Sequence, residues 1–161
     1  MRTSVVFLMG LLVGSLVAPG FAQGDRLPGE NYVNHVAISV SNFDEAFAFY
    51  TQKLGFREAF TVRDAQGQAT LAYVQVSRNT FVELQRANAT RPPGLNHFGL
   101  HVADLKESVA FLKKRGVTVE EPRVRPDDSS VANATDSNGI RIEMFEFGPG
   151  SPQGKAIASW K

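Results

Sequence analysis

The chain contains the stretch Tyr32-Val33-Asn34-His35-Val36-Ala37-Ile38-Ser39-Val40, and 62 residues later (97 − 35) it contains Gly94-Leu95-Asn96-His97-Phe98-Gly99-Leu100-His101-Val102. Both stretches place an Asn-His pair inside a segment that alternates in the manner of a β-strand. Each is followed by a helix pattern with a capping-box start, in which the cap side chain accepts a hydrogen bond from a backbone N–H of the first turn. The cap pairs are Asn42 with Glu45, and Asp104 with Glu107. The chain therefore repeats one structural unit.

Each unit continues with three shorter segments of strand character. A glycine, Gly55 or Gly116, ends each predicted helix. The predicted strands then cover 56–63, 70–76 and 80–85 in the first unit and 117–124, 129–135 and 139–147 in the second. The sequence thus predicts an α+β fold of paired β-α-β-β-β modules, 32–86 and 94–147. Together they form one domain over residues 32–147, followed by a C-terminal tail at 148–161.

Strand parity divides the side chains of this sheet between two faces. One face of each first strand is apolar and suits the apolar stripe of a helix. The opposite face carries His35 in the first module and His97 in the second. On the last strand of each module the same parity places Glu83 and Glu143 opposite the apolar residues. A face that bears histidines and carboxylates at equivalent repeat positions is predicted to be the wall of a pocket.

The whole pattern resembles the vicinal oxygen chelate superfamily, which includes glyoxalase I, methylmalonyl-CoA epimerase, extradiol dioxygenases, and fosfomycin and bleomycin resistance proteins. The resemblance spans about residues 32–147, and the closing segment Asp136-Ser137-Asn138-Gly139-Ile140-Arg141-Ile142-Glu143 also supports it. It implies a mixed sheet curled into a cup, with helices on the outer face. It also implies a metal site at the floor of the cup. Two imidazoles and two carboxylates suit one divalent ion such as Zn, Ni, Co, Fe or Mn. The implied ligands are His35, Glu83, His97 and Glu143.

The ligand pattern is closest to that of glyoxalase I, so the resemblance implies a metal-dependent lyase or isomerase. Its substrate would be a small molecule chelated through vicinal oxygens, and the reaction would pass through a metal-stabilised enediolate. Glu143 is then the expected catalytic base, and Glu83 is its catalytic counterpart on the opposite side. His101 lies on the histidine face of its strand and is a candidate substrate-binding residue.

Two positions depart from the glyoxalase I pattern. That family has an Arg four residues beyond its first histidine and an Asn four residues beyond its first glutamate, where this chain has Ser39 and Ala87. Since the Arg holds a glutathione carboxylate in those enzymes, its absence disfavours a glutathione hemithioacetal as the substrate.

Two other functions remain open alternatives. An extradiol-type dioxygenase would use two histidines and one glutamate, and Glu83 as a fourth ligand would fill part of the face left open for oxygen. A non-catalytic small-molecule-binding protein, like the resistance proteins, would need an aromatic cleft instead of metal ligands. Aromatic side chains that share the parity of the ligands are candidates to line such a cleft: Phe81, Phe145 and Phe147.

The first 22 residues have the order of a secretory signal peptide. Arg2 precedes an apolar run from Val5 to Val17, and small residues at Gly20 and Ala22 suit cleavage after Ala22. The run is shorter than the roughly 20 residues that span a bilayer. We therefore expect an exported protein, periplasmic or secreted, with no stable membrane span after cleavage.

The amino-acid composition limits the kinds of molecule that the protein is expected to bind. The chain has 161 residues with Lys+Arg 17 against Asp+Glu 16, a balance that gives no basic surface for nucleic acid. Cys 0 excludes disulfides and thiolate metal ligands. The expected partner is a small-molecule substrate. The linker at 87–94 allows the modules to pair within one chain or to swap in a homodimer.

Overall fold

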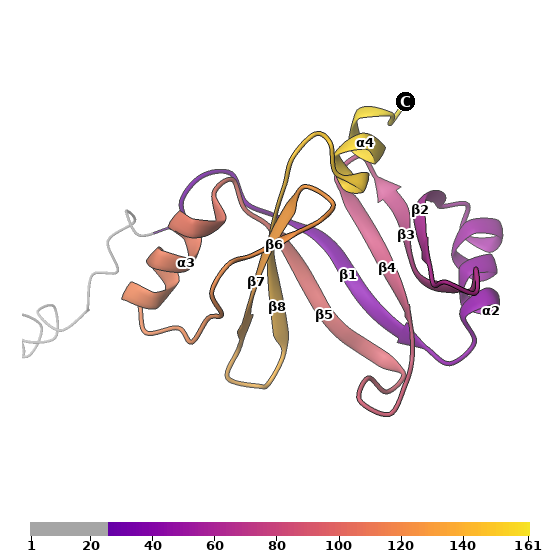
Figure 1. The fold of residues 1–161 in the computed structure, drawn as a ribbon, viewed down its shortest axis with the longest axis horizontal. Coiled ribbons are helices and arrows are strands. Elements are labelled where there is room, and N and C mark those ends of the chain that lie inside the picture. Colours follow the sequence, from indigo (N-terminus) through magenta and orange to yellow (C-terminus); the bar gives the residue numbers. More distant parts are fainter. Residues whose placement is uncertain (1–25) are drawn as a thin grey trace, which may run out of the picture.

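The computed structural model describes residues 26–161 (Figure 1). The predicted signal peptide at 1–22 lies outside the described residues, and export stays a prediction. Within the described part, no helix is both long and apolar enough to cross a membrane. The elements in chain order are β1 (Tyr32–Val40), α2 (Phe43–Ala48), the π-helical turn η1 (Phe49–Lys53), β2 (Arg57–Arg63), β3 (Ala69–Ser77), β4 (Thr80–Arg86), β5 (Gly94–His101), α3 (Leu105–Lys114), β6 (Arg123–Arg125), β7 (Ser129–Thr135), β8 (Arg141–Phe147) and α4 (Pro152–Ala158).

All eight strands form one sheet in the order β2-β3-β4-β1-β5-β8-β7-β6 (Figure 1). The two Asn-His strands, β1 and β5, are antiparallel neighbours at its centre. Each has the glutamate strand of its own module beside it in parallel, β4 next to β1 and β8 next to β5. The two modules therefore pair within one chain, and the register brings the central residues of both to the same place.

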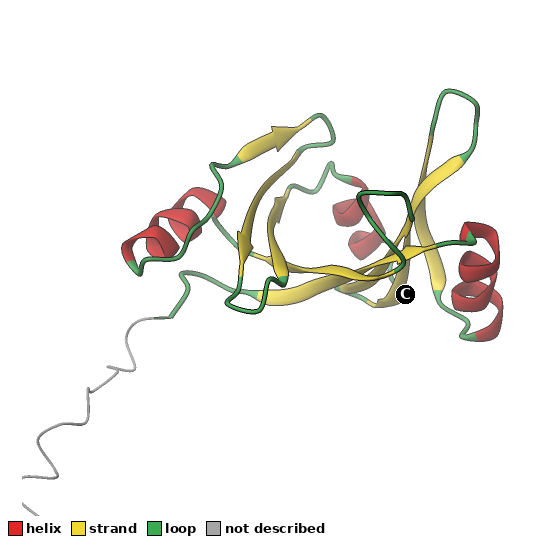
Figure 2. Cartoon of the chain, turned by 90° about the horizontal axis from the view of Figure 1, so that it is seen from below, coloured by secondary structure: helices red, strands yellow, loops and turns green. Residues whose placement is uncertain are grey.

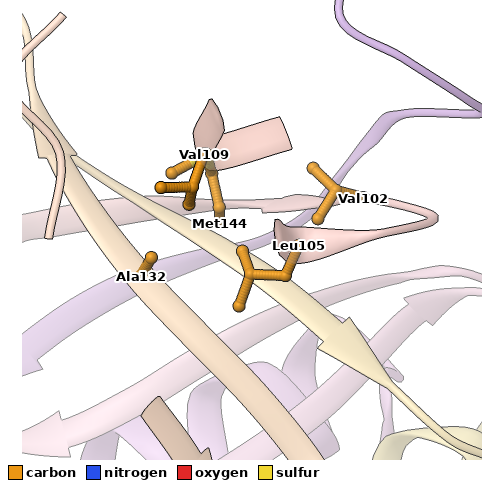
Figure 3. Packing of buried hydrophobic residues seen from close by; sticks show 5 residues of the cluster. All are labelled: Val102, Leu105, Val109, Ala132 and Met144. Carbon is orange, nitrogen blue, oxygen red and sulfur yellow. The ribbon is translucent and has the colours of Figure 1, made fainter. Parts of the chain in front are cut away.

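The repeated helices begin where the capping boxes predict. The Asn42 side chain accepts a hydrogen bond from the Glu45 backbone N–H at 3.2 Å, and Asp104 accepts one from Glu107 at 2.8 Å. The helices then pack on the apolar face of the sheet. In the second module Leu105 of α3 is buried against strand residues in the cluster of Figure 3, which contains Val102, Leu105, Val109, Ala132 and Met144.

The sheet curls so that its other face becomes the inside of a cup, with α2 and α3 outside it (Figure 2). This confirms the predicted α+β fold with helices on the outer face. The C-terminal tail contributes α4, which the sequence analysis does not predict. Ala156 of α4 packs against Tyr73 and Phe81, which lie on the face opposite α2.

One predicted strand differs from the structure. The segment 117–124 was expected to be extended throughout, but β6 covers only Arg123–Arg125 and Val119 makes an isolated bridge to Ala134. Pro122 lies between these two pairings. Because proline has no backbone N–H to donate to a neighbouring strand, continuous pairing is disfavoured there.

Candidate metal centre

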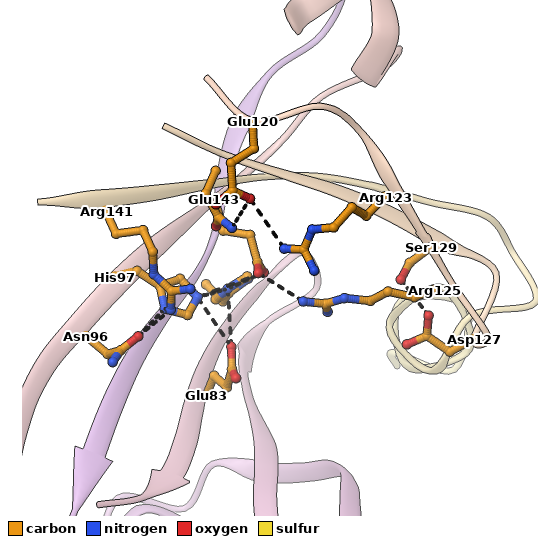
Figure 4. Close-up of polar contacts among 12 residues, drawn as sticks. Glu83, Asn96, His97, Glu120, Arg123, Arg125, Asp127, Ser129, Arg141 and Glu143 are labelled. Carbon is orange, nitrogen blue, oxygen red and sulfur yellow. Dashed lines mark hydrogen bonds and ion pairs between the residues drawn. The ribbon is translucent and has the colours of Figure 1, made fainter. Parts of the chain in front are cut away.

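The four predicted metal ligands meet at the floor of the cup. The Nε2 atoms of His35 and His97 are 3.1 Å apart. Glu83 Oε2 lies 3.3 Å from His35 Nε2 and 3.7 Å from His97 Nε2. Glu143 Oε2 lies 3.6 Å and 3.9 Å from the same two nitrogens. Figure 4 shows Glu143 reaching toward His97 from above and Glu83 from below. All four residues are buried, so the site is shielded from bulk solvent.

Small residues on the neighbouring strand make room for the two imidazoles. His35 on β1 faces Gly99 on β5, and His97 on β5 faces Ala37 on β1. Gly99 has no side chain, and Ala37 is fully buried. The antiparallel pairing thus places each histidine over the small residue of the other module.

The asparagine before each histidine contacts the Nδ1 atom of that histidine. Asn34 Oδ1 lies 3.1 Å from His35 Nδ1, and Asn96 Oδ1 lies 2.7 Å from His97 Nδ1. The Asn34 amide is oriented because its nitrogen donates to the carbonyl of Asn79 at 3.1 Å. A carbonyl oxygen can only accept, so His35 Nδ1 carries the hydrogen and His35 Nε2 presents a lone pair. At His97 the Arg141 guanidinium, which can only donate, also contacts Nδ1 and Asn96 Oδ1.

Both histidines are neutral. The pKa of His35 and the pKa of His97 are each lowered to about 3, first by burial and then by nearby positive charge, including the guanidinium groups of Arg125 and Arg141. Their contacts with the glutamates are therefore not ion pairs. Two imidazole nitrogens and two carboxylate oxygens converge on one point. This donor set fits a divalent cation. Within residues 26–161, His35, Glu83 and His97 each offer one ligand atom, and these atoms lie within 4.8 Å of one another.

Glu83 is held by neutral partners. The Tyr73 hydroxyl donates to Glu83 Oε2 at 2.8 Å, and the Gln85 side-chain amide donates to Oε1. Burial raises the pKa of Glu83, and the nearby charge of Glu143 raises it further, while the bonds from Gln85 and Tyr73 oppose that rise.

Glu143 is held by a cation instead. Arg125, on the short strand β6, donates to Glu143 Oε1 at 3.0 Å (Figure 4). Burial raises the pKa of Glu143, and the charges of Arg125 and Arg141 lower it. On the neighbouring strand β7, the residue paired with Glu143 is Asn133, whose side chain donates to Glu120 at 2.8 Å and not to the site. The two glutamates are thus equivalent in the repeat but different in their surroundings.

A cavity of about 300 Å³ opens beside the ligands. Glu83, His97 and Glu143 lie in its lining. The rest of its wall mixes apolar side chains from β2 and β3 with polar ones, and it includes Phe60, Leu71, Arg91, Arg125 and Gln153. A small molecule in this cavity would contact both carboxylates.

His101 does not line this cavity. Its ring lies between those of Tyr32 and Phe147, with centroids 4.7 Å and 4.6 Å away. Burial lowers the pKa of His101. The structure brings the four predicted ligands together but leaves His101 apart from them, and its role in substrate binding stays a prediction.

The candidate aromatic lining lies beneath the ligands. Phe81 and Phe145 are almost completely buried, and the Phe145 ring centroid is 6.1 Å from that of His35. Phe145 in turn contacts Phe147 at 5.3 Å. None of the three is among the residues that line the cavity beside the ligands, so in the described part of the chain they do not form the aromatic cleft of a sequestering protein.

Sequence reasoning missed Tyr73, Gln85 and Arg125. Tyr73 faces Glu83 across the β3–β4 ladder, so strand register would have found it once the hairpin was placed. Arg125 gives no such signal, because the first module has no equivalent arginine with which the repeat could have matched it.

Paired modules in one curled sheet, with a buried His-Glu-His-Glu set at its floor, define a cup-shaped domain whose floor has the donors for a metal ion. The chain belongs to the Glyoxalase/Bleomycin resistance protein/Dioxygenase superfamily, whose family model matches residues 32–144.

Three relatives illustrate the range of the superfamily. The chain is 30% identical to a 2-epi-5-epi-valiolone epimerase from Actinomyces sp., over 80% of this chain and 86% of that one. It is 27% identical to a probable chloroplastic lactoylglutathione lyase from Arabidopsis thaliana, over 71% of this chain and 35% of that one. Among solved structures, methylmalonyl-CoA epimerase from Mycobacterium tuberculosis superposes with a TM-score of 0.62 at 24% identity, covering 73% and 88% of the two chains, which supports the fold.

Proposed function

We propose that the protein is a divalent-metal-dependent isomerase, and specifically an epimerase, of a small substrate with oxygens on neighbouring carbons. The observation that carries this proposal is the pair of buried carboxylates, Glu83 and Glu143, whose Oε2 atoms flank the histidine nitrogens. Epimerisation removes a proton from one face of a carbon and returns one to the other face, so it needs an acid and a base on opposite sides. An epimerase and a glyoxalase-type lyase among the relatives support the same class of chemistry.

A divalent ion held by the four ligands would polarise the substrate carbonyl and stabilise the negative charge that develops on its oxygen. The chain itself supplies the proton transfer at the adjacent carbon. Glu143 is the better base of the two, because Arg125 and Arg141 favour its ionised form. Glu83 is the better acid, because its hydrogen-bond donors Tyr73 and Gln85 are neutral, and because burial and the charge of Glu143 favour its protonated form against the smaller opposing effect of Arg125.

The surroundings also keep water away from the reaction. Glu83 and Glu143 are only 3% and 4% exposed, so bulk water has little access to either carboxylate. The arrangement of two carboxylates favours an enzyme that transfers protons over an extradiol-type dioxygenase, because a dioxygenase of that type leaves one face of its ion open for oxygen.

The test is incorporation of solvent deuterium into the substrate. The protein, loaded separately with each candidate ion, is incubated in D₂O with 2-epi-5-epi-valiolone, with the methylglyoxal–glutathione hemithioacetal and with methylmalonyl-CoA. We expect exchange at the carbon next to the carbonyl for at least one of them. Glu143→Gln and Glu83→Gln should each slow it by about 100-fold or more.

The exposed Glu121→Gln serves as the matched control, since Glu121 pairs with Lys113 at the surface, away from the site. It should keep full activity. Absence of exchange with every probe and every ion, or full exchange in both glutamate variants, would contradict the proposal.

A further inference from the structure

The C-terminal helix α4 is fixed as one wall of the cup. Arg57 of β2 donates to the carbonyl of Ala156 at 2.9 Å and to that of Ser159 at 3.1 Å. Ala156 also packs on the ring of Tyr73, whose hydroxyl holds Glu83. This helix lies beyond residue 144, where the match to the superfamily model ends, so that match assigns it no role.

Gln153 of α4 lines the cavity, and its side-chain oxygen has no hydrogen-bond partner among the described residues. It is 2% exposed and lines the cavity together with Glu83 and Glu143. Within residues 26–161, no group lies within hydrogen-bond distance of its buried Oε1. A buried carbonyl without a donor is unfavourable, so this oxygen is suited to accept a hydrogen bond from a bound molecule.

The side-chain carbonyl of Gln85, which also lines this cavity, likewise lacks a hydrogen-bond donor among the described residues. The Gln85 amide nitrogen donates to Glu83 Oε1. In the ionised state that binds a cation, the Glu83 carboxylate accepts and does not donate, so this bond fixes which end of the Gln85 amide points away from Glu83. Gln85 Oε1 is therefore an acceptor, and it too has no hydrogen-bond partner among the described residues.

We propose that Gln153 and Gln85 are substrate-binding residues that accept hydrogen bonds from hydroxyl groups, and that the substrate is a small polyhydroxylated ketone. Two oriented acceptors from separate elements, β4 and α4, select a ligand that carries several donors around its reactive carbonyl. A cavity of about 300 Å³ suits a single small ring. The inference rests on the proposed function for the position of that carbonyl.

The experiment measures ligand affinity and does not need turnover. Calorimetric titration of the metal-loaded protein compares 2-epi-5-epi-valiolone, a cyclic ketone with several hydroxyl groups, with 1,2-cyclohexanedione, which has vicinal oxygens, one of them largely as its enol, but no further ring hydroxyls. We expect the wild type to bind the polyol more tightly. Gln153→Leu should weaken polyol binding by about tenfold, as expected for one neutral hydrogen bond, and should leave the affinity for the dione unchanged.

Lys155→Ala is the matched control, because Lys155 lies on the same helix and is exposed. It should bind both ligands as the wild type does. A structural disturbance of α4 would weaken both ligands together, so equal loss for the two in Gln153→Leu overturns the proposal. It is also overturned if Gln153→Leu changes neither affinity, or if the wild type shows no preference for the polyol.

The two proposals fail in different ways. Gln153-dependent polyol binding without any deuterium exchange would reject the epimerase function and keep the hydroxyl-binding role. Deuterium exchange with an affinity that does not respond to Gln153→Leu would keep the function and reject the role of Gln153.

Discussion

The imidazole of His35 fills the space that any side chain at Gly99 would need. A Cβ atom at position 99 would lie 2.0 Å from His35 Cε1 and 2.2 Å from Nδ1, far inside van der Waals contact. The two residues are paired across β1 and β5. A glycine in a central strand usually weakens the sheet, and at this position it leaves room for a metal ligand.

The first prediction concerns this pair. Gly99→Ala should displace the His35 ring and lower the affinity for the divalent ion by at least about tenfold, a loss typical of disturbed ligand orientation. Competition with a chromophoric chelator measures it. Ala132→Gly is the control, since Ala132 is buried on β7 against α3 and outside the site. It should lower the unfolding midpoint without changing metal affinity, and equal metal affinities in the two variants would contradict the prediction.

The second prediction separates the histidines of β5. His97→Ala should reduce the bound metal from about one ion per chain, the number expected for a single four-ligand site, to nearly none. His101→Ala should keep the ion, because its ring packs between Tyr32 and Phe147 and away from the ligands. Elemental analysis of the purified proteins gives both values. Retention of the metal by His97→Ala would remove the basis for the site.

The third prediction concerns pH. The pKa of His35 and of His97 is lowered to about 3 in the folded protein, against 6.5 in an unfolded chain. Between these values only the unfolded state takes up the protons. The two histidines' contribution to the free energy of unfolding is therefore complete above pH 6.5 and is lost as the pH falls toward 3. NMR of the metal-free protein should show that neither imidazole titrates from pH 8 to 5; midpoints near 6.5 for both would refute this.

The fourth prediction concerns the proposed base. Arg125 lowers the pKa of Glu143 through its charge and its hydrogen bond. Arg125→Met should therefore raise that pKa and move the acid limb of the kcat/KM profile to higher pH, because the base must be ionised. Arg123→Met should move it less, since Arg123 contributes less and pairs with Glu120 at the surface. An unchanged limb in Arg125→Met would exclude Glu143 as the group that titrates.

The repeat made the fold and the ligand set accessible from the sequence. Asn-His strands at an offset of 62 and the two capping boxes predicted both modules, and parity placed His35 and Glu83 on one face before any register was known. Symmetry supplied the argument, because a residue type that recurs at the same position of each module is rarely there by chance.

Residues that differ between the two modules could not be predicted in this way. Tyr73 on β3 is paired with Glu83 and donates a hydrogen bond to it. In the other module Asn133 is paired with Glu143 but donates to Glu120. The hydrogen bond to Glu143 comes from Arg125 instead. Gln153 belongs to a helix with no counterpart in the first module. These positions depend on tertiary packing between distant segments, for which local periodicity carries no information.

The direct pairing of β1 with β5 has a consequence for behaviour in dilute solution. Both histidines and both glutamates come from a single polypeptide, so the site is assembled as soon as the chain folds. Specific activity should then be independent of protein concentration, down to the low levels at which subunits of a shared-site enzyme would separate and lose their ligands.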